Sequence, residues 1–192
     1  MLSEKFKNHK IILASNSPRR QELLRGLSFE FLIEVKTVNE LYSSDLKHSE
    51  ITEYLATLKS DAFHNVSENT IIITADTIVW LKDKALEKPK NRNEAIEMIH
   101  QLSDNSHEVI TSVCIKSSKS QKIITDITKV YFNKLTLNEI TYYVDKYKPY
   151  DKAGSYGIQE WIGFIGVSKI EGSYFNVMGL PVHKIYQELK NL

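Results

Sequence analysis

Short apolar runs alternate along this chain with segments in which apolar residues recur at helical spacing. The strand candidates are the apolar runs at 10–14, 29–35, 70–80, 107–115 and 122–132. The helix candidates are amphipathic segments at 17–26, 50–63 and 91–102, one that opens at Thr136, and one that starts at Pro181. Alternation of the two element types predicts an α/β fold.

Local signals mark several element ends. Ser17 is a good N-cap, Pro18 suits the first helical position, and Gly26 suits the position after the last turn. The segments Asn91–Glu94 and Thr136–Glu139 have the spacing of a capping box, in which two side chains and two backbone amides pair at a helix start. These signals predict where three helices begin.

The remaining segments are turns, loops and further strands. Residues 107–115 and 122–132 are expected to pair across the polar segment between them. Residues 148–160 are predicted to form a polar, glycine-containing loop. The pattern in Ile162–Val177 predicts a pair of strands that turns at Glu171–Gly172.

Length and composition narrow the class of protein. A chain of 192 residues favours one compact domain, residues 1–192, or two small lobes around a shared cleft. The formal net charge of +1 gives no basic field for nucleic acid, so a local cluster of cations must hold any anionic ligand. The single cysteine, Cys114, excludes an intramolecular disulfide. There is no signal-peptide pattern and no apolar run long enough for a bilayer, so we expect a cytoplasmic protein.

The first candidate for chemistry is Ser15–Arg20, where a strand leads into a helix. Unpaired amides and the helix dipole favour an anion at such an N-terminus, and two arginines add donors suited to phosphate. The segment lacks the glycine pattern of a Walker A loop. Taken alone, these six residues fit an ordinary capped helix with solvated arginines better than an anion site.

The second candidate is Asp76, a single carboxylate inside an apolar strand. Burying it is costly unless it is paired, hydrogen-bonded or bound to metal. It suits a general base or an oxygen ligand for Mg²⁺ or Mn²⁺, and a structural Asp bonded to backbone amides remains the alternative.

The third candidate is the loop 151–159, whose glycines permit tight turns. Its Gln159 offers both a donor and an acceptor to a nucleobase edge. A plain surface loop is the alternative. The six histidines have no metal-ligand spacing, so a zinc site is not expected.

Together these segments resemble the Maf family in order and spacing. The resemblance rests on ASNSPRRQELL at 14–24, TADT at 74–77, LEKP at 86–89, DKAGSYGIQ at 151–159 and GSYFNVMGLP at 172–181. It implies an α/β fold of the Maf/ITPase-like kind, with a mixed central sheet flanked by helices and two lobes around a substrate cleft. Relatives of this type are often dimers, so the resemblance allows a homodimer.

The resemblance also implies an activity. Such proteins use a divalent metal cation, Mg²⁺ or Mn²⁺, to cleave nucleoside triphosphates to the monophosphate and pyrophosphate, a house-cleaning reaction of the nucleotide pool. The loop DKAGSYGIQ is similar to that of the subgroup acting on dTTP and UTP, with serine for alanine at 155. Neither a nucleic acid nor a membrane is an expected partner. The alternatives are a regulator of cell division (septum formation) that acts by nucleotide or protein binding, a nucleotide-binding regulator without hydrolysis, and a pyrophosphatase of other specificity.

The resemblance assigns roles position by position. Asp76 matches the proton acceptor, and Asp76 with Glu40 would hold the metal. The residues that match substrate-binding and specificity positions are Ser15, Arg19, Arg20, Lys59, Thr77, Lys88 and Gln159. The match at Lys59 is looser, because Ser60 stands where the family usually has alanine.

Overall fold

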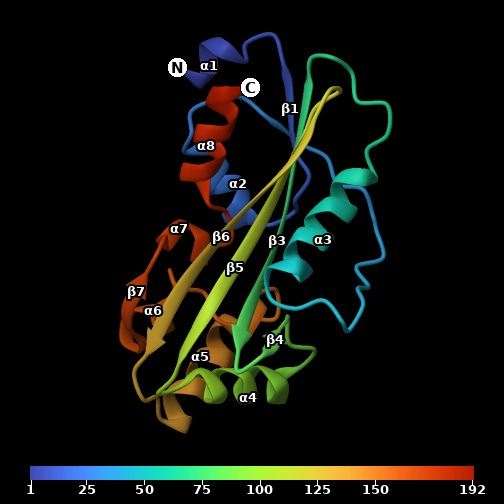
Figure 1. Ribbon diagram of the computed structural model, residues 1–192. Helices are drawn as coiled ribbons and strands as arrows, with labels where there is room; N and C mark the ends of the chain where they lie inside the picture. Colours follow the sequence, from blue (N-terminus) through green and yellow to red (C-terminus); the bar gives the residue numbers. More distant parts are fainter. The chain divides into compact units, whose positions relative to one another are not determined.

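The computed structural model describes residues 1–192 (Figure 1). Its strands are β1 (Lys10–Leu13), β2 (Leu32–Ile33), β3 (Thr70–Leu81), β4 (Lys84–Leu86), β5 (Ser106–Lys116), β6 (Gln121–Phe132) and β7 (Val167–Glu171). Its helices are α1 (Leu2–Lys5), α2 (Pro18–Arg25), α3 (Ser49–Asp61), α4 (Arg92–Leu102), α5 (Leu137–Tyr147), α6 (Trp161–Gly166), α7 (Tyr174–Val177) and α8 (Val182–Asn191), with a 3₁₀ turn at Ala153–Ser155.

The strands form one seven-stranded mixed sheet. Its order is β2-β1-β3-β5-β6-β7, and β4 pairs with β3 outside this path. β1 runs parallel to both β2 and β3, whereas β4 is antiparallel to β3 and β7 is antiparallel to β6. The mixed sheet with helices between its strands confirms the predicted α/β class.

The chain divides into two compact units. The first unit comprises Met1–Asp76, Thr111–Asp126 and Gly179–Leu192, and the second comprises Thr77–Ile110 and Ile127–Met178. The strands β3, β5 and β6 contribute residues to both units. Asp76 is the last residue of its segment in the first unit.

In the first unit, strand alternation separates two apolar layers. Successive side chains of a strand point to opposite faces of the sheet. Ile11 and Leu13 of β1 belong to the core that also contains side chains of α1, α2 and α8, whereas Ile12 and Ala14 pack with Phe63, just beyond α3. Figure 1 shows α2 and α8 on one side of these strands and α3 on the other. The same alternation in β3 places its even-numbered residues on the α3 face.

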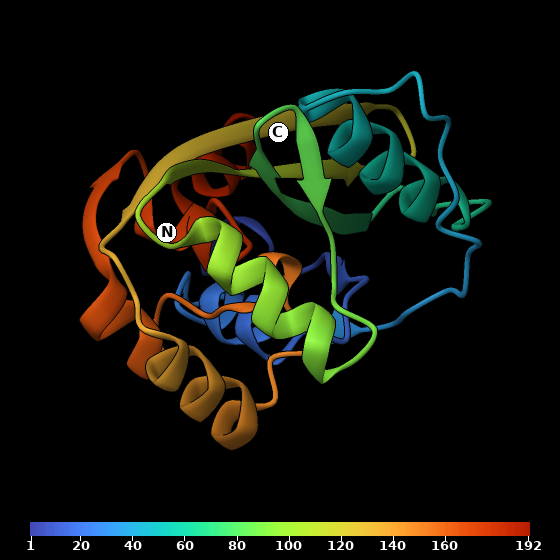
Figure 2. The same ribbon diagram turned by 90° about the horizontal axis from the view of Figure 1, so that it is seen from below.

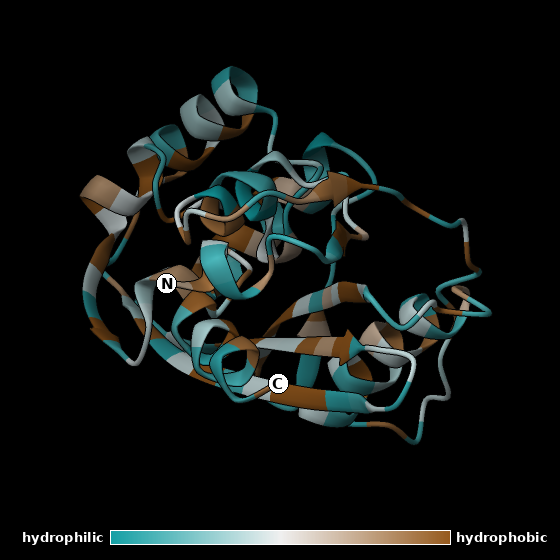
Figure 3. Cartoon of the chain, turned by 90° about the horizontal axis from the view of Figure 1, so that it is seen from above, coloured by the Kyte–Doolittle hydropathy of each residue, from teal (hydrophilic) through white to brown (hydrophobic).

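The second unit has its own apolar core beneath α4 and α5. The two helices lie side by side (Figure 2) and contact each other. Each buries one apolar face. The fully buried residues of these faces are Ala95, Ile99 and Leu102 on α4, and Ile140, Tyr143 and Val144 on α5. Figure 3 shows apolar and polar residues mixed along the helices, as one-sided burial requires. No helix in the chain has both the length and the apolar character needed to cross a membrane.

The predicted helix starts are confirmed by their caps. The hydroxyl of Ser17 accepts from the Arg20 amide, and the Asn91 side chain accepts from the Glu94 amide. The full capping box, with both reciprocal bonds, forms between Thr136 and Glu139. These bonds span only three residues, so the local sequence is sufficient to specify them.

Two strand predictions were wrong. Residues 162–177 contain α6, β7 and α7 instead of a hairpin, because β7 pairs with β6 and the hydroxyl of Ser173 caps α7. The strand predicted over 29–35 is reduced to Leu32–Ile33, both exposed, because only these two residues pair with β1.

Candidate active site

Asp76 lies within β3 and is almost fully buried, with 8% of its surface exposed. It is two residues beyond Thr74, whose hydroxyl donates to a backbone carbonyl of α3, so both side chains lie on the α3 face. A charged carboxylate in such a place is stable only with partners. The groups around Asp76 therefore determine its charge state and its strength as a base.

The direct partner of Asp76 is Lys59, from the last turn of α3. The Lys59 ammonium lies 2.7 Å from Asp76 Oδ1 and 2.7 Å from Glu40 Oε2. The side chains of Lys59 and Asp76 are mostly buried, whereas half of the Glu40 side chain is exposed, in the loop before α3. One cation thus joins two carboxylates that are 36 residues apart in the sequence.

Burial sets the protonation behaviour of Asp76. Loss of hydration raises the pKa of its carboxyl above the ordinary value, and the nearby Glu40 carboxylate raises it further. The positive charges of Lys59 and Arg20 oppose this rise. A carboxylate with a raised pKa is a stronger proton acceptor than an ordinary aspartate, which is the property a general base needs.

The turn between β1 and α2 places two serine hydroxyls at the start of a helix. Ser15, buried two residues after the end of β1, accepts a hydrogen bond from the Ser17 amide at 3.2 Å. Ser17 caps α2, and Pro18 occupies its first turn. Arg19 follows on the partly exposed side. Hydroxyls and amide donors at a helix N-terminus suit phosphate oxygens.

Arg20 is held more firmly than the sequence suggested. Its Nε donates to the carbonyl of Gly179 at 2.9 Å, and its Nη1 donates to the carbonyl of Ala75 at 2.7 Å. Burial lowers the pKa of this guanidinium, and the Asp76 carboxylate counters that effect. Arg20 thus ties α2 to β3 and to the segment before α8, and brings positive charge to Asp76.

The other predicted residues, Thr77, Lys88 and Gln159, belong to the second unit. Thr77 follows Asp76 on β3, so its side chain points to the opposite face of the sheet. Lys88 is exposed between β4 and α4. Gln159 is half-buried, and its Oε1 is shielded from solvent with no hydrogen-bond partner in the protein. A buried acceptor of this kind is suited to a donor supplied by a ligand.

The loop 151–159 is anchored by residues that the sequence did not single out. Lys152 is buried, and its Nζ lies 2.8 Å from Asp151 Oδ1 and 3.1 Å from Glu160 Oε1. Glu160 also accepts the hydroxyl of Tyr143, whose oxygen accepts from the Gly157 amide at 3.1 Å. In the sequence, this cluster is marked only by the opposite charges of Lys152 and Glu160 near the two ends of the loop. Such pairs are common on protein surfaces.

The donor set near Asp76 fits a hard divalent cation. The protein has no group of three or more His, Cys, Asp or Glu side chains arranged to hold a metal. Glu40 and Asp76 nevertheless converge on one point, the Lys59 ammonium. Mg²⁺ typically binds through one or two carboxylates, with substrate phosphates and water completing its shell. Two carboxylates are therefore enough to fit a Mg²⁺ ion whose remaining ligands are not protein side chains.

The fold itself has a counterpart among solved structures. A HAM1 protein from Coxiella burnetii superimposes with a TM-score of 0.52, covering 96% of this chain and all of that one at 16% identity. At this identity the likeness concerns the fold alone, and it confirms the predicted fold class.

Sequence comparison gives the family. The chain belongs to the Maf-like protein family, which matches residues 10–192. A dTTP/UTP pyrophosphatase of Christiangramia forsetii is 55% identical over 100% of this chain and 98% of the relative. The dTTP/UTP pyrophosphatases of Flavobacterium johnsoniae and Bacteroides thetaiotaomicron are 54% and 50% identical, the first over both whole chains and the second over 96% of each. The names of these relatives give no support to a role in septum formation.

Proposed function

We propose that this protein is a pyrophosphatase that hydrolyses dTTP and UTP to the nucleoside monophosphate and pyrophosphate, and so removes unwanted nucleotides from the pool. The observation that carries the proposal is the cluster of buried Asp76 with Lys59 and the half-exposed Glu40, to which Arg20 of α2 is linked through the Ala75 carbonyl. Full-length relatives with this activity in their names support the substrate class. In this proposal residues 1–192 act as one catalytic domain.

Asp76 acts as the proton acceptor in this reaction. Water attacks phosphorus at the α–β anhydride, its proton passes to the Asp76 carboxylate, and pyrophosphate leaves with the electrons of the broken P–O bond. Burial of Asp76 raises its pKa and so strengthens it as a base. Stabilising the charge on the leaving pyrophosphate is the other main demand of phosphoryl chemistry.

The cations and donors of the site meet that second demand. In this proposal the hydroxyls of Ser15 and Ser17 bind phosphate oxygens, Arg19 and Lys88 add positive charge, and Lys59 contacts the phosphates while it orients Asp76. Arg20 serves the site by position, since two of its donors are bound to backbone carbonyls.

Glu40 and Asp76 would hold the divalent metal, Mg²⁺ or Mn²⁺. Bound there, the cation would neutralise phosphate charge and lower the pKa of a coordinated water. Exposure of Glu40 leaves this carboxylate accessible to a metal–nucleotide complex from solvent. The residues themselves supply only oxygen ligands, which favours a hard cation over zinc.

Gln159 is the residue we propose to read the base. Thymine and uracil carry an N3–H donor that cytosine lacks, and the shielded Oε1 of Gln159 is an acceptor without a protein partner. A site built on such a bond rejects ligands that leave it unmade. Replacing Gln159 by alanine should weaken or relax pyrimidine use; an unchanged substrate profile would remove Gln159 from the specificity argument. Arg19 and Thr77 are the other proposed specificity residues.

The test is pyrophosphate release from a panel of canonical nucleoside triphosphates with Mg²⁺ or Mn²⁺. We expect turnover of dTTP and UTP that is lost in Asp76→Asn and retained in Asp45→Asn, a matched change at an exposed aspartate. Folded protein that releases no pyrophosphate from any nucleotide would refute the proposal. Preference for a purine nucleotide would refute its specificity alone.

A further inference from the structure

The hydroxyl of Thr74 bonds the middle of α3 to the strand that carries Asp76. Thr74 Oγ1 donates to the carbonyl of Ala56 at 2.6 Å, and both residues are completely buried. A carbonyl inside an α-helix already accepts the amide four residues further on. The bond from Thr74 is thus an addition to the helix, and it joins α3 to β3 at one defined point.

The Thr74–Ala56 bond lies next to the Asp76–Lys59 contact, both along β3 and along α3. Thr74 is two residues before Asp76, on the same face of β3. Ala56 is three residues before Lys59, on neighbouring turns of the same side of α3. The Thr74–Ala56 bond and the Asp76–Lys59 contact are therefore adjacent links between the same two elements.

The buried side of α3 carries more small side chains than large ones. Thr52, Ala56 and Ser60 recur every four residues and are fully buried, beside the two large buried residues Ile51 and Leu55. Such a face lets a helix approach closely, but it offers few large side chains whose interlocking would oppose sliding along the helix axis. Directional hydrogen bonds can supply that resistance.

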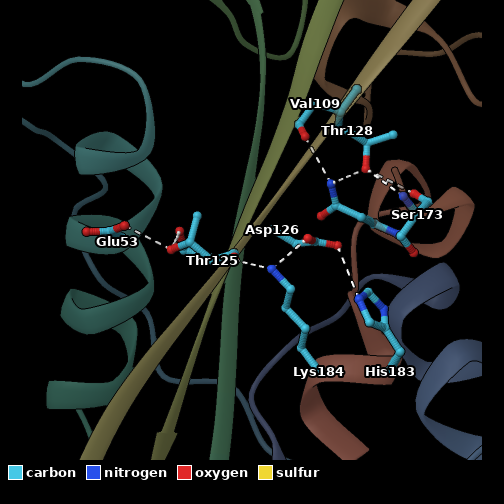
Figure 4. A network of polar contacts seen from close by, with 10 residues as sticks. Glu53, Val109, Thr125, Asp126, Thr128, Ser173, His183 and Lys184 are labelled. Carbon is cyan, nitrogen blue, oxygen red and sulfur yellow. Dashed lines mark hydrogen bonds and ion pairs between the residues drawn. The ribbon is translucent and has the colours of Figure 1, made fainter. Parts of the chain in front are cut away.

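A second set of hydroxyls joins α3 to the neighbouring strands. Thr52 pairs with Ser112 at 2.7 Å, and Ser112 pairs with Thr125 at 2.9 Å. Thr125 donates to Glu53 at 2.9 Å, and Figure 4 shows Glu53 reaching from α3 toward Thr125. These bonds hold the first half of α3, and Lys116 Nζ of β5 donates to the Ser60 carbonyl in its last turn at 3.3 Å. Thr74 joins α3 to β3 itself, next to Lys59.

We propose that Thr74 is a positioning residue, which sets the register of α3 along β3 and so holds the Lys59 ammonium against Asp76. This rests on the proposed function only in that Asp76 is its proton acceptor. Without the hydroxyl, the part of α3 beside β3 can shift by a small distance, and Lys59 no longer meets Asp76 in one geometry. A displacement of about 1 Å near reacting groups can cost up to about 100-fold in rate.

The kinetic test compares Thr74→Val, which keeps the branched shape, with Thr74→Ser, which keeps the hydroxyl. The matched control is Thr70→Val, which removes a hydroxyl bonded to Ser67 at the start of the same strand. We expect Thr74→Val to lower kcat on the order of tenfold with a smaller change in KM. Thr74→Ser should restore kcat, and Thr70→Val should leave it unchanged.

A second test follows Lys59 without any turnover. Site-resolved acylation, read by mass spectrometry, reports how firmly the Lys59 ammonium is held, with Lys184 as the internal reference. We expect several-fold faster acylation of Lys59 in Thr74→Val than in the wild type and in Thr70→Val. If the wild type hydrolyses no nucleotide, the proposed function fails, and this measurement still decides on the register of α3.

The proposal is overturned if folded Thr74→Val keeps wild-type kcat and Lys59 reactivity. Equal losses in Thr74→Val and Thr70→Val would also overturn it, since they would indicate general destabilisation. If Thr74→Val does not fold, Thr74→Cys replaces it in both measurements, because a thiol has similar size but is only a weak donor.

Discussion

Replacement of Lys59 by methionine tests the electrostatics of the site most directly. The change keeps the length of the side chain and removes the ammonium that lies 2.7 Å from both Asp76 and Glu40. Removing one partner of a buried ion pair costs about 3–5 kcal/mol when the other charge stays buried. Glu40 is half exposed, so losing its contact with Lys59 should cost about as much stability as losing a surface ion pair, about 0–1 kcal/mol.

In Lys59→Met, protonation of Asp76 limits the loss of stability. Its folded-state pKa is already raised, and it rises further once Lys59 no longer opposes burial. Between the unfolded and folded pKa values the native state binds more protons than the unfolded state, so stability falls as the pH rises through this range. We therefore expect Lys59→Met to cost roughly 1–3 kcal/mol at pH 8 and much less at pH 5.

The assay is urea unfolding of the wild type and Lys59→Met at these two pH values, repeated in an Asp76→Asn background. With the carboxylate removed, the Lys59 change should cost under about 1 kcal/mol and lose its pH dependence. A loss of the same size at pH 5 and pH 8 would refute the electrostatic reasoning. So would a loss that is unchanged in the Asp76→Asn background, because packing would then explain it.

Four further predictions concern other parts of the molecule. Asp76→Asn should lower kcat by about 10²–10⁴-fold yet unfold at higher urea than the wild type at pH 8, because the raised pKa makes the charged carboxylate a cost to the fold; lower stability would contradict this. Burial lowers the pKa of His107 to about 3, so the wild type should lose stability as the pH falls from about 6.5 toward 3. His107→Gln, which can still pair with the Tyr156 hydroxyl, should flatten that pH dependence, and an unchanged slope in urea titrations would count against it. Gly163→Ala places a Cβ 1.9 Å from the Ile158 carbonyl oxygen and should cost at least about 2 kcal/mol in the unfolding free energy; wild-type stability would show that α6 can shift. Chelation of divalent cations should abolish pyrophosphate release, with recovery on addition of Mg²⁺ or Mn²⁺; full activity in excess chelator would exclude the metal.

The sequence by itself determined features that depend on neighbours a few residues away. The caps at Ser17, Asn91 and Thr136 are set by side chains and amides three residues apart, and all three were predicted. The apolar run of β3 predicted a buried strand with one carboxylate inside it, and Asp76 is buried there. The motifs along the chain also predicted the family, which the comparisons confirm.

Only the tertiary structure decided which distant residues meet. No local pattern brings Glu40, Lys59 and Asp76 together, because their contact depends on which face of β3 receives α3. Arg20 was expected to serve phosphate alone, and its bonds to Ala75 and Gly179 arise from segments far along the chain. The predicted hairpin at 162–177 failed for the same reason. The strand in this segment, β7, pairs with β6 instead. The alternation of residues along a strand does not determine which distant strand it pairs with.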